Sequence, residues 1–412
     1  MKSQTPAFAR LANTSIREFR GRVAKVGLGH GRGLKKLDAV ISAPLMRLDG
    51  TTAKVGYDPD THLLLDVTEP LQDIPADPTP DELRAALKQL WSPFQKFPFC
   101  GPVDRAVLLC ALMTAVQRPI LPTAPAFAFD APRQGTGKSL VAECVGIVAT
   151  GELPQAWPHI EKNEEEIRKR LLTALRGATQ VMLWDNVVGQ FDSPAFATLL
   201  TSPNYGDRVL GVSDSESYPN RMLALLTGNN FSPSGELPRR VLTCRLDAAS
   251  ERPFTRTFGF NPRDMFLADR QSYVRCVLIL LRGYVAAGSP TMSTKSLGSF
   301  GEWDKMIRQA VIWIGTNVAP ENEFSDPLIS VLERDVADPA DEALGAMMVA
   351  WCEHFGDEMV AASELLKVHR KTREYLGSPS EAESRLADGL EEFSHGRNLT
   401  GVMIRPSFQS SS

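Results

Sequence analysis

The sequence predicts an α/β protein whose core is a mostly parallel sheet, preceded by a small β-rich and helical element and followed by a helical region. Three observations support this class. Between about residues 119 and 260, short apolar runs alternate with helix-like segments, a pattern typical of parallel sheets covered by helices. A glycine-rich turn joins one apolar run to a helix. Beyond residue 260 the pattern is helical.

The composition is that of an ordinary globular protein. The 412 residues are 43% hydrophobic and carry a formal net charge of −4, which argues against a histone-like binder but allows a local basic channel. The longest apolar run is interrupted by Arg282, so no membrane span is expected. The six cysteines form no Cys-x-x-Cys pair and no secretory signal begins the chain, so we expect reduced core cysteines in a cytoplasmic protein.

The region before the predicted core has two parts. Residues 1–36 carry nine lysines or arginines against one acid, and we expect a basic flexible arm that either solubilises the protein or contacts phosphates. Residues 37–118 are expected to form a small β-rich and helical region. Its linker "DIPADPTPDEL" places Thr79 to cap a helix that starts at Pro80, with Glu82 completing a capping box.

The turn "APRQGTGKSL" contains the residue types that hold the phosphates of a nucleotide. Backbone N–H groups converge on an anion only where the chain wraps tightly, which Gly135 and Gly137 permit, and the following helix adds its unpaired N–H groups. Lys138 would reach the β- and γ-phosphates, and the Ser139 hydroxyl would bind Mg²⁺. The first position of the G-x-x-x-x-G-K-[ST] pattern is Pro132. The predicted ATP-binding residues are Pro132, Arg133, Gln134, Gly135, Thr136, Gly137, Lys138, Ser139 and Leu140.

The run "TQVMLWDNV" predicts a second strand that ends in an acid. Asp185 would hold Mg²⁺ together with Ser139. The next residue is Asn186. Many ATPases with a glycine-rich turn of this kind carry a glutamate there, which activates water. An amide orients water but is a poor base, so the water-activating group stays open.

Two further motifs follow the acidic strand. "RMLALLTGNN" predicts a strand whose terminal amide would hold the attacking water, with Asn229 favoured over Asn230. "ELPRRVLTCRLD" places Arg239 and Arg240 after a short loop. One of them would stabilise charge on the γ-phosphate of a neighbouring subunit, and the alternative is a surface salt bridge for both.

With these motifs in this order, the chain resembles an AAA+ ATPase, and more narrowly the superfamily 3 helicase-like ATPases of phages, plasmids and integrated mobile elements. The resemblance covers about residues 37–315 and rests on "APRQGTGKSL", "EEEIRKRLLTAL", "VMLWDNVVG", "LLTSPNYGDRVLGVSDSESYPNRMLALLTGNN" and "ELPRRVLTCRLD". It implies that residues 119–260 form an AAA+ P-loop core with ATP and Mg²⁺ as cofactors. It also implies a homo-hexameric ring, whose channel would concentrate positive charge on single-stranded or forked DNA.

The resemblance also implies a β-hairpin that points into the central pore. The candidate is "DRVLGVSDSESYPNRMLAL", whose tip "SDSES" has no lysine. The residues expected to contact DNA are Arg208, Ser213, Ser215 and Arg221. Members of this family often act beside a primase, which makes a primase or another replication protein the expected partner.

The rest of the chain is expected to be mainly helical. Residues 261–358 would form a helical region, and residues 359–405 suit a winged-helix module. Residues 406–412 would form a disordered tail.

Two functions follow from these expectations. The leading one is an ATP-hydrolysing ring motor, a DNA helicase or translocase in the replication of a mobile element. The alternative is a non-helicase AAA+ ATPase, such as a loader, a transposition regulator or a phage-defence ATPase, that uses ATP to control assembly. The missing hairpin lysines and Asn186 favour this alternative. A small-molecule kinase would leave the asparagine strand and the paired arginines without a role.

Overall fold

The computed structural model describes most of the chain in two compact units, residues 1–331 and 332–412. The described residues are 37–335, apart from 48, 54, 68–72, 161–162, 209–214, 249–258 and 320–322, together with short pieces between 349 and 404. The predicted basic arm at 1–36, Ser213 and the tail at 406–412 lie outside them. Within the described residues, no helix is long and apolar enough to cross a membrane.

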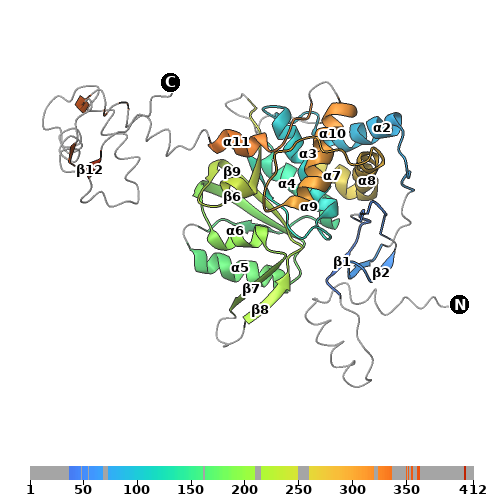
Figure 1. The fold of residues 1–412 in the computed structure, drawn as a ribbon, viewed down its shortest axis with the longest axis horizontal. Helices are drawn as coiled ribbons and strands as arrows, with labels where there is room; N and C mark the ends of the chain where they lie inside the picture. The colour runs from blue at the N-terminus through green and yellow to red at the C-terminus, as the bar shows by residue number, and fades with distance from the viewer. Residues whose placement is uncertain are drawn as a thin grey trace, which may run out of the picture. The chain divides into compact units, whose positions relative to one another are not determined.

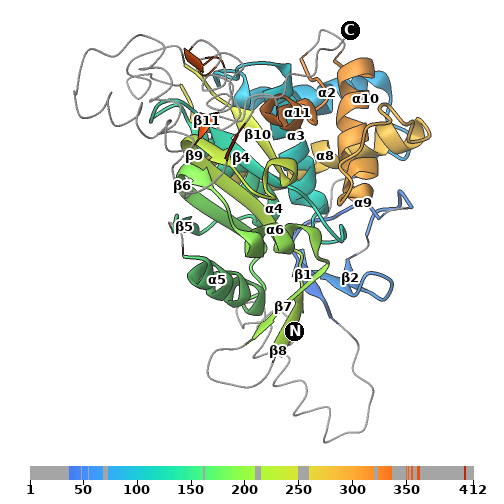
Figure 2. The same cartoon turned by 60° about the vertical axis from the view of Figure 1, so that its left-hand side comes forward.

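The first unit is built around a five-stranded sheet in which every neighbouring pair is parallel (Figures 1 and 2). Its order is β10–β4–β9–β6–β5. The strands are β4 (Ala126–Asp130), β5 (Ala156–Pro158), β6 (Val181–Phe191), β9 (Leu223–Pro233) and β10 (Val241–Arg245). The α/β class with a parallel sheet is therefore confirmed. β9 lies between β4, which leads into the glycine-rich turn, and β6, which carries Asp185.

Two of these strands are longer than the sequence predicts. We expected the strands to end near Asp185 and within Thr227–Asn230, but they continue to Phe191 and Pro233. The register between β6 and β9 shifts just after Trp184, and the two strands then pair again as far as Phe191 and Pro233. The neighbouring strand satisfies the backbone groups beyond the acid, so the chain passes the site as a bulged strand and does not turn away.

The described part of the chain also contains helices and short helical turns. They are α2 (Pro80–Trp91), α3 (Pro102–Gln117), α4 (Lys138–Thr150), α5 (Glu164–Arg176), α6 (Pro194–Thr201), α7 (Pro262–Ala268), α8 (Arg270–Ala286), α9 (Gly301–Trp303), α10 (Gln309–Asn317) and α11 (Ile329–Asp335), with 3₁₀ turns η1 (Ser92–Phe94) and η2 (Pro238–Arg240) and the π-helical turn η4 (Asp304–Arg308). The start of α2 confirms the predicted capping box. Thr79 Oγ1 accepts a hydrogen bond from Glu82 N at 3.3 Å, and Glu82 Oε2 accepts one from Thr79 N at 2.8 Å.

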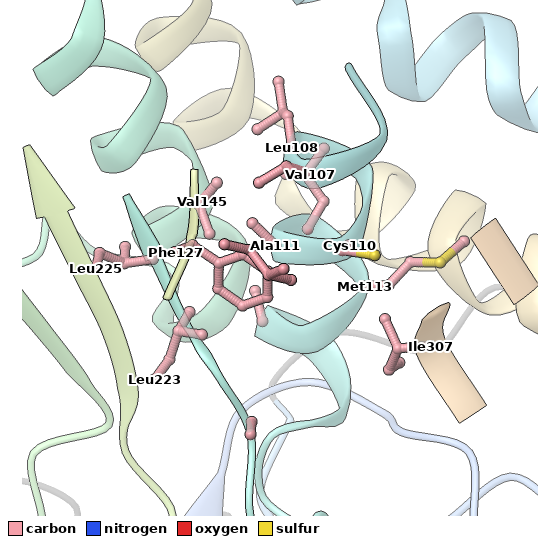
Figure 3. Packing of buried hydrophobic residues seen from close by; sticks show 14 of the residues in the cluster. Val107, Leu108, Cys110, Ala111, Met113, Phe127, Val145, Leu223, Leu225 and Ile307 are labelled. Atoms are coloured by element: carbon pink, nitrogen blue, oxygen red, sulfur yellow. The ribbon is translucent and has the colours of Figure 1, made fainter. Parts of the chain in front are cut away.

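The core lies where α3 and α4 pack beside β4. Figure 3 shows Phe127 of β4 among Ala111 of α3, Val145 of α4 and Leu225 of β9, and all four side chains are fully buried. Burying a phenylalanine side chain contributes about 1.5–3 kcal/mol relative to leaving it exposed. This packing fixes the strand and the helix that flank the glycine-rich turn.

Four of the five described cysteines are buried as expected, at positions 110, 144, 244 and 276. The expectation of a core position is wrong for Cys100, which is exposed. This residue lies in the turn between η1 and α3, where the chain passes over the surface.

A separate three-stranded sheet precedes α2. It contains β1 (Ala39–Ile41), β2 (Gly56–Asp58) and β3 (Leu63–Leu65), with β3 in the middle. Arg270 ties this sheet to the core, because its Nη1 donates to Ser42 O at 3.1 Å and its Nε donates to Val148 O at 3.0 Å. Gln180 Nε2 adds a hydrogen bond to Val40 O at 3.0 Å.

A buried ion network joins η4 to the segment before α11. The side chain of Arg308 is 0% exposed. Its guanidinium donates to Asp304 Oδ1 at 2.6 Å and to the two carboxylate oxygens of Asp326 at 2.8 and 2.6 Å. A bidentate arginine pair of this kind is among the strongest polar contacts in proteins.

The second unit contains one described strand pair. β11 (Val360–Ala361) pairs antiparallel with β12 (Met403–Ile404). The other residues of the expected winged-helix module at 359–405 lie outside the described residues.

Candidate nucleotide-binding site

The loop between β4 and α4 turns tightly at two glycines. Gly135 has φ 81° and Gly137 has φ 104°, a region that other residues adopt only with strain. A Cβ on Gly137 would also lie 2.8 Å from Cε1 of Phe97. α4 begins directly after this loop, so the N–H groups of its first turn, which have no partner within the helix, lie next to the loop. The loop therefore has the backbone conformation and the donors that a phosphate group requires.

The other predicted loop residues lie in the same turn and in the first turn of α4. Pro132, Arg133 and Gln134 are exposed, whereas Thr136 is buried and donates through Oγ1 to Arg133 O at 3.2 Å. Leu140 is half-buried and lines the pocket described below. The exposed segment leaves one side of the turn open to a ligand.

Lys138 points from the start of α4 toward the sheet. Its Nζ donates to Asn229 Oδ1 of β9 at 2.6 Å. Burial lowers the pKa of Lys138, and the carboxylates of Asp130 and Asp185 oppose this shift. The ammonium group therefore lies in a partly desolvated place where a phosphate would interact with it more strongly than in water.

Asp185 is held in position by a threonine of the neighbouring strand. Thr227 Oγ1 donates to Asp185 Oδ1 at 2.6 Å, and it accepts a hydrogen bond from Asn186 N at 3.2 Å. Ser139 Oγ of α4 donates to the same carboxylate oxygen at 3.4 Å. The hydroxyl and the acid predicted to hold Mg²⁺ are thus brought together, although 46 residues separate them in the sequence.

The oxygen atoms of Ser139 and Asp185 fit a magnesium ion. Mg²⁺ prefers hard oxygen ligands, and it usually takes one or two protein groups while phosphate oxygens and waters complete its shell. One hydroxyl and one carboxylate at hydrogen-bond distance form such a partial set. Ser139 is exposed, so phosphate and water can reach this place.

The three asparagines near the acid differ in their surroundings. Asn229 is half-buried and contacts Lys138, whereas Asn230 is exposed with φ 49°. Asn186 is also exposed and has φ 58°, directly at the register shift of β6. Of the three, Asn229 is the one whose side chain is hydrogen-bonded to Lys138 at the start of α4.

Asp130, the last residue of β4, lies near the site although it was not predicted as one of its residues. Asp130 is 2% exposed, and its carboxylate lies 3.6 Å from Arg245 Nε and accepts a hydrogen bond from Phe231 N at 3.4 Å. Its charge also acts on Lys138. A single acid at the end of the apolar run "AFAFD", directly before the turn, was the available signal. Thr227 was also not predicted as a residue of the site. Its position in "LLTGNN" does not indicate that its hydroxyl is hydrogen-bonded to Asp185.

A pocket of about 450 Å³ lies beside the glycine turn. Apolar side chains, including Phe97, Pro98 and Phe260, form much of its lining. Arg263 and Glu143 line it as well and form an ion pair at 3.2 Å. A largely apolar pocket of this size next to the glycine-rich turn has room for a small planar ligand.

The two arginines after β9 have different environments. Both pair with Glu236, but the side chain of Arg239 is 66% exposed and that of Arg240 is 16% exposed. Arg240 also donates to Ala197 O at 2.5 Å. Arg240 therefore has a structural contact within the chain, while the side chain of Arg239 is mostly exposed.

The segment expected to form a pore hairpin does form an antiparallel pair. β7 (Asn204–Arg208) pairs with β8 (Ser215–Pro219), and residues 209–214, which include Ser213, lie outside the described residues. Both strands lie beside α5 in Figures 1 and 2. Arg168 of α5 clamps the hairpin, since its Nε and Nη2 donate to the carboxylate of Asp207 at 2.8 and 2.5 Å.

Arg221 lies at the base of the hairpin and not on its arms. Its Nη1 donates to Leu121 O at 3.3 Å, and the buried Arg118 beside it donates to Asn220 O and Met222 O at 3.0 and 2.9 Å. Burial lowers the pKa of Arg221, as it does that of Arg118. This placement gives Arg221 a structural contact and does not favour the DNA contact expected from the sequence.

Comparisons with known proteins give little beyond this geometry. No protein-family model matches the chain, and no curated protein matches it. Structural neighbours include the apo C-terminal region of NrS-1, with 10% identity over 92% of this chain and 86% of that chain and a TM-score of 0.38. Another is the JCV helicase, with 11% identity over 56% of this chain and 66% of that chain and a TM-score of 0.25. TM-scores this low do not show a shared function.

Proposed function

We propose that the protein is an ATP-hydrolysing ring motor of the AAA+ class, a DNA helicase or translocase that acts in the replication of a mobile element. The observation that carries the proposal is the convergence of four side chains on one turn. Lys138 and Ser139 begin α4, Asp185 lies on β6 and Asn229 lies on β9. Lys138 is hydrogen-bonded to Asn229 at 2.6 Å, and Ser139 is hydrogen-bonded to Asp185 at 3.4 Å. A lysine, a hydroxyl, an acid and an amide at a glycine turn are the groups that nucleoside triphosphate hydrolysis uses.

Each group has one role in the proposal. The loop and Lys138 bind the phosphates, and Thr227 keeps the Asp185 carboxylate turned toward Ser139. Magnesium held by Ser139 and Asp185 would supply neutralisation of the phosphate charge. When Lys138 donates to a phosphate oxygen and no longer to Asn229 Oδ1, the amide of Asn229 becomes available to hold the attacking water.

Asn186 is proposed to orient water without removing its proton. Its side chain is exposed next to the acid, but an amide is a poor base at neutral pH. Asp130 is 2% exposed and interacts with Arg245, which suits a carboxylate that balances the charge of Lys138 better than one that deprotonates water.

We assign the trans-acting arginine to Arg239. In a ring, an arginine that completes the site of the next subunit has to reach across the interface, and the exposed side chain of Arg239 is free to do so once it leaves Glu236. Arg240 is less suited, because it is largely buried and bound to Ala197 O.

Mixed rings test the site and the arginine together. Lys138→Ala should abolish ATP turnover, and Arg239→Ala should lower it strongly. Mixing the two variants should restore part of the activity, because some interfaces then combine an intact turn with an intact arginine. Lys169→Ala is the matched control, since it removes another exposed helical ion pair, and it should leave turnover unchanged. Unchanged hydrolysis by Lys138→Ala would refute the nucleotide site, and absence of rescue would refute the trans role.

One observation favours the alternative, an AAA+ ATPase that uses ATP only to control assembly. The hairpin segment 207–219 contains no lysine and one arginine, Arg208, which is little positive charge for holding a phosphate backbone. Unwinding of a forked DNA substrate would support the motor, whereas nucleotide-dependent assembly without unwinding would support the switch.

A further inference from the structure

A second pocket, of about 530 Å³, lies between α2, the start of α3 and the residues Val318, Ala319 and Glu323. Aromatic rings form one of its walls. Trp91 and Phe99 have ring centroids 5.5 Å apart, and those of Phe97 and Phe99 are 6.2 Å apart. Phe97 and Phe99 are half-buried, so parts of their rings are accessible to an occupant. The proposed role of the phosphate-binding turn does not use this pocket.

Cations line the same pocket. Arg84 and Lys88 come from one face of α2, four residues apart, and Arg105 comes from α3. Lys88 lies in the last turn of α2, where the helix dipole favours a cation, so both positive charges are compatible with a stable helix. Glu323 is the acid among the lining residues.

These cations have few acidic partners. Arg84 pairs with Asp81 at 2.6 Å on the exposed surface of α2. Arg105 donates through Nε to the backbone oxygen of Glu323 at 2.7 Å. In the part of the chain that the structure describes, no acidic group forms an ion pair with Lys88. The pocket therefore keeps an excess of positive charge next to its aromatic wall.

We propose that this pocket binds a nucleotide unit, that is, a planar base with its phosphate. Aromatic side chains stack on bases and nearby cations attract the phosphate, which is how many proteins hold nucleotides without reading their sequence. An apolar ligand would not need the cations, and a simple inorganic anion would not need the rings. The unit is either a free mononucleotide or one residue of a single strand, since both present the same chemistry.

The test uses the full chain and the variant Lys88→Glu. Lys88 is exposed, so the variant should fold, and charge reversal should weaken binding about tenfold. The matched control is Lys295→Glu, an exposed lysine that lines neither pocket. Phe99→Leu removes a stacking surface without a change of charge, and it should weaken the same binding by about tenfold.

Two measurements distinguish the sources of the nucleotide. Equilibrium dialysis with labelled ADP should give two sites per chain if free nucleotide is the ligand, and Lys88→Glu should weaken one of them only. Fluorescence anisotropy with labelled dT20 should show the tenfold loss if a strand is the ligand. Either loss supports the pocket. If the Lys88 variant binds both probes like the wild type, or if the Lys295 control loses as much, the proposal is overturned.

This test is separable from the test of the phosphate-binding turn. If that turn bound no nucleotide, dialysis would detect one site, and that site would be the one sensitive to Lys88→Glu. If the second pocket bound none, the one remaining site would be insensitive to Lys88→Glu and lost in Lys138→Ala.

Discussion

Replacing Thr227 with valine tests whether the acid of the site depends on its neighbouring strand. Valine has nearly the same shape as threonine, so the variant removes the hydroxyl and little else. That hydroxyl makes the 2.6 Å hydrogen bond to Asp185 and accepts the bond from Asn186 N. Thr227 is 1% exposed, so water cannot easily replace the lost group.

The size of the effect follows from the charge of the acceptor. A hydrogen bond to an ionised group contributes about 1.5–3 kcal/mol, and about 1.4 kcal/mol corresponds to a tenfold change in rate. If hydrolysis requires the carboxylate in its present orientation, kcat should fall about 10- to 100-fold. The KM for ATP should change little, because the turn and Lys138 are untouched.

Thr243→Val is the matched control. Thr243 lies on β10, is 3% exposed, and among the described residues its hydroxyl has no hydrogen-bond partner. Its removal should leave kcat unchanged and leave the free energy of unfolding equal or slightly higher. Steady-state ATP hydrolysis and urea unfolding measure both quantities. A Thr227 variant with kcat within twofold of the wild type would show that Asp185 does not depend on this bond.

Three further changes have distinct expected outcomes. Gly137→Ala should weaken ATP binding more than tenfold in calorimetry, because a methyl group would meet Phe97 in a backbone with φ 104°, and an unchanged Kd would contradict this. Arg308→Ala should lower the free energy of unfolding by about 3–5 kcal/mol, because two carboxylates lose their buried partner; a loss below about 1 kcal/mol in urea unfolding would contradict it. Arg168→Ala should spare basal ATP turnover and reduce its stimulation by DNA, because Asp207 no longer anchors the hairpin to α5, and full stimulation would show that this clamp is unnecessary.

The conformation of the glycine-rich turn was predictable because it depends on neighbouring residues. Gly135, Gly137 and Lys138 follow one another, and the conformations that they need are set by the residues themselves. The cap at Thr79 was predictable for the same reason, since its partner is three residues away. The parallel sheet followed from a pattern repeated over several strands.

The parts of the site that depend on contacts between distant strands were not predictable. Asp130 meets Arg245, and Thr227 meets Asp185, because parallel pairing places residues from different strands in register. The extension of β6 beyond Asp185 also depends on pairing with β9, which the composition of "DNVVGQF" does not indicate. The walls of both pockets come from separate helices and loops, so no single stretch of sequence indicates them.

The ring of Phe97 belongs to two cavities at once. It lines the pocket beside the glycine-rich turn and also the pocket beside α2. A shift of this one ring toward either side would enlarge one space and reduce the other. If a ligand in the first cavity changes the affinity of the second cavity for its ligand by some factor, the second ligand must change the affinity of the first cavity by the same factor. The ring of Phe97 alone would thus couple the binding of two ligands that are not in contact with each other.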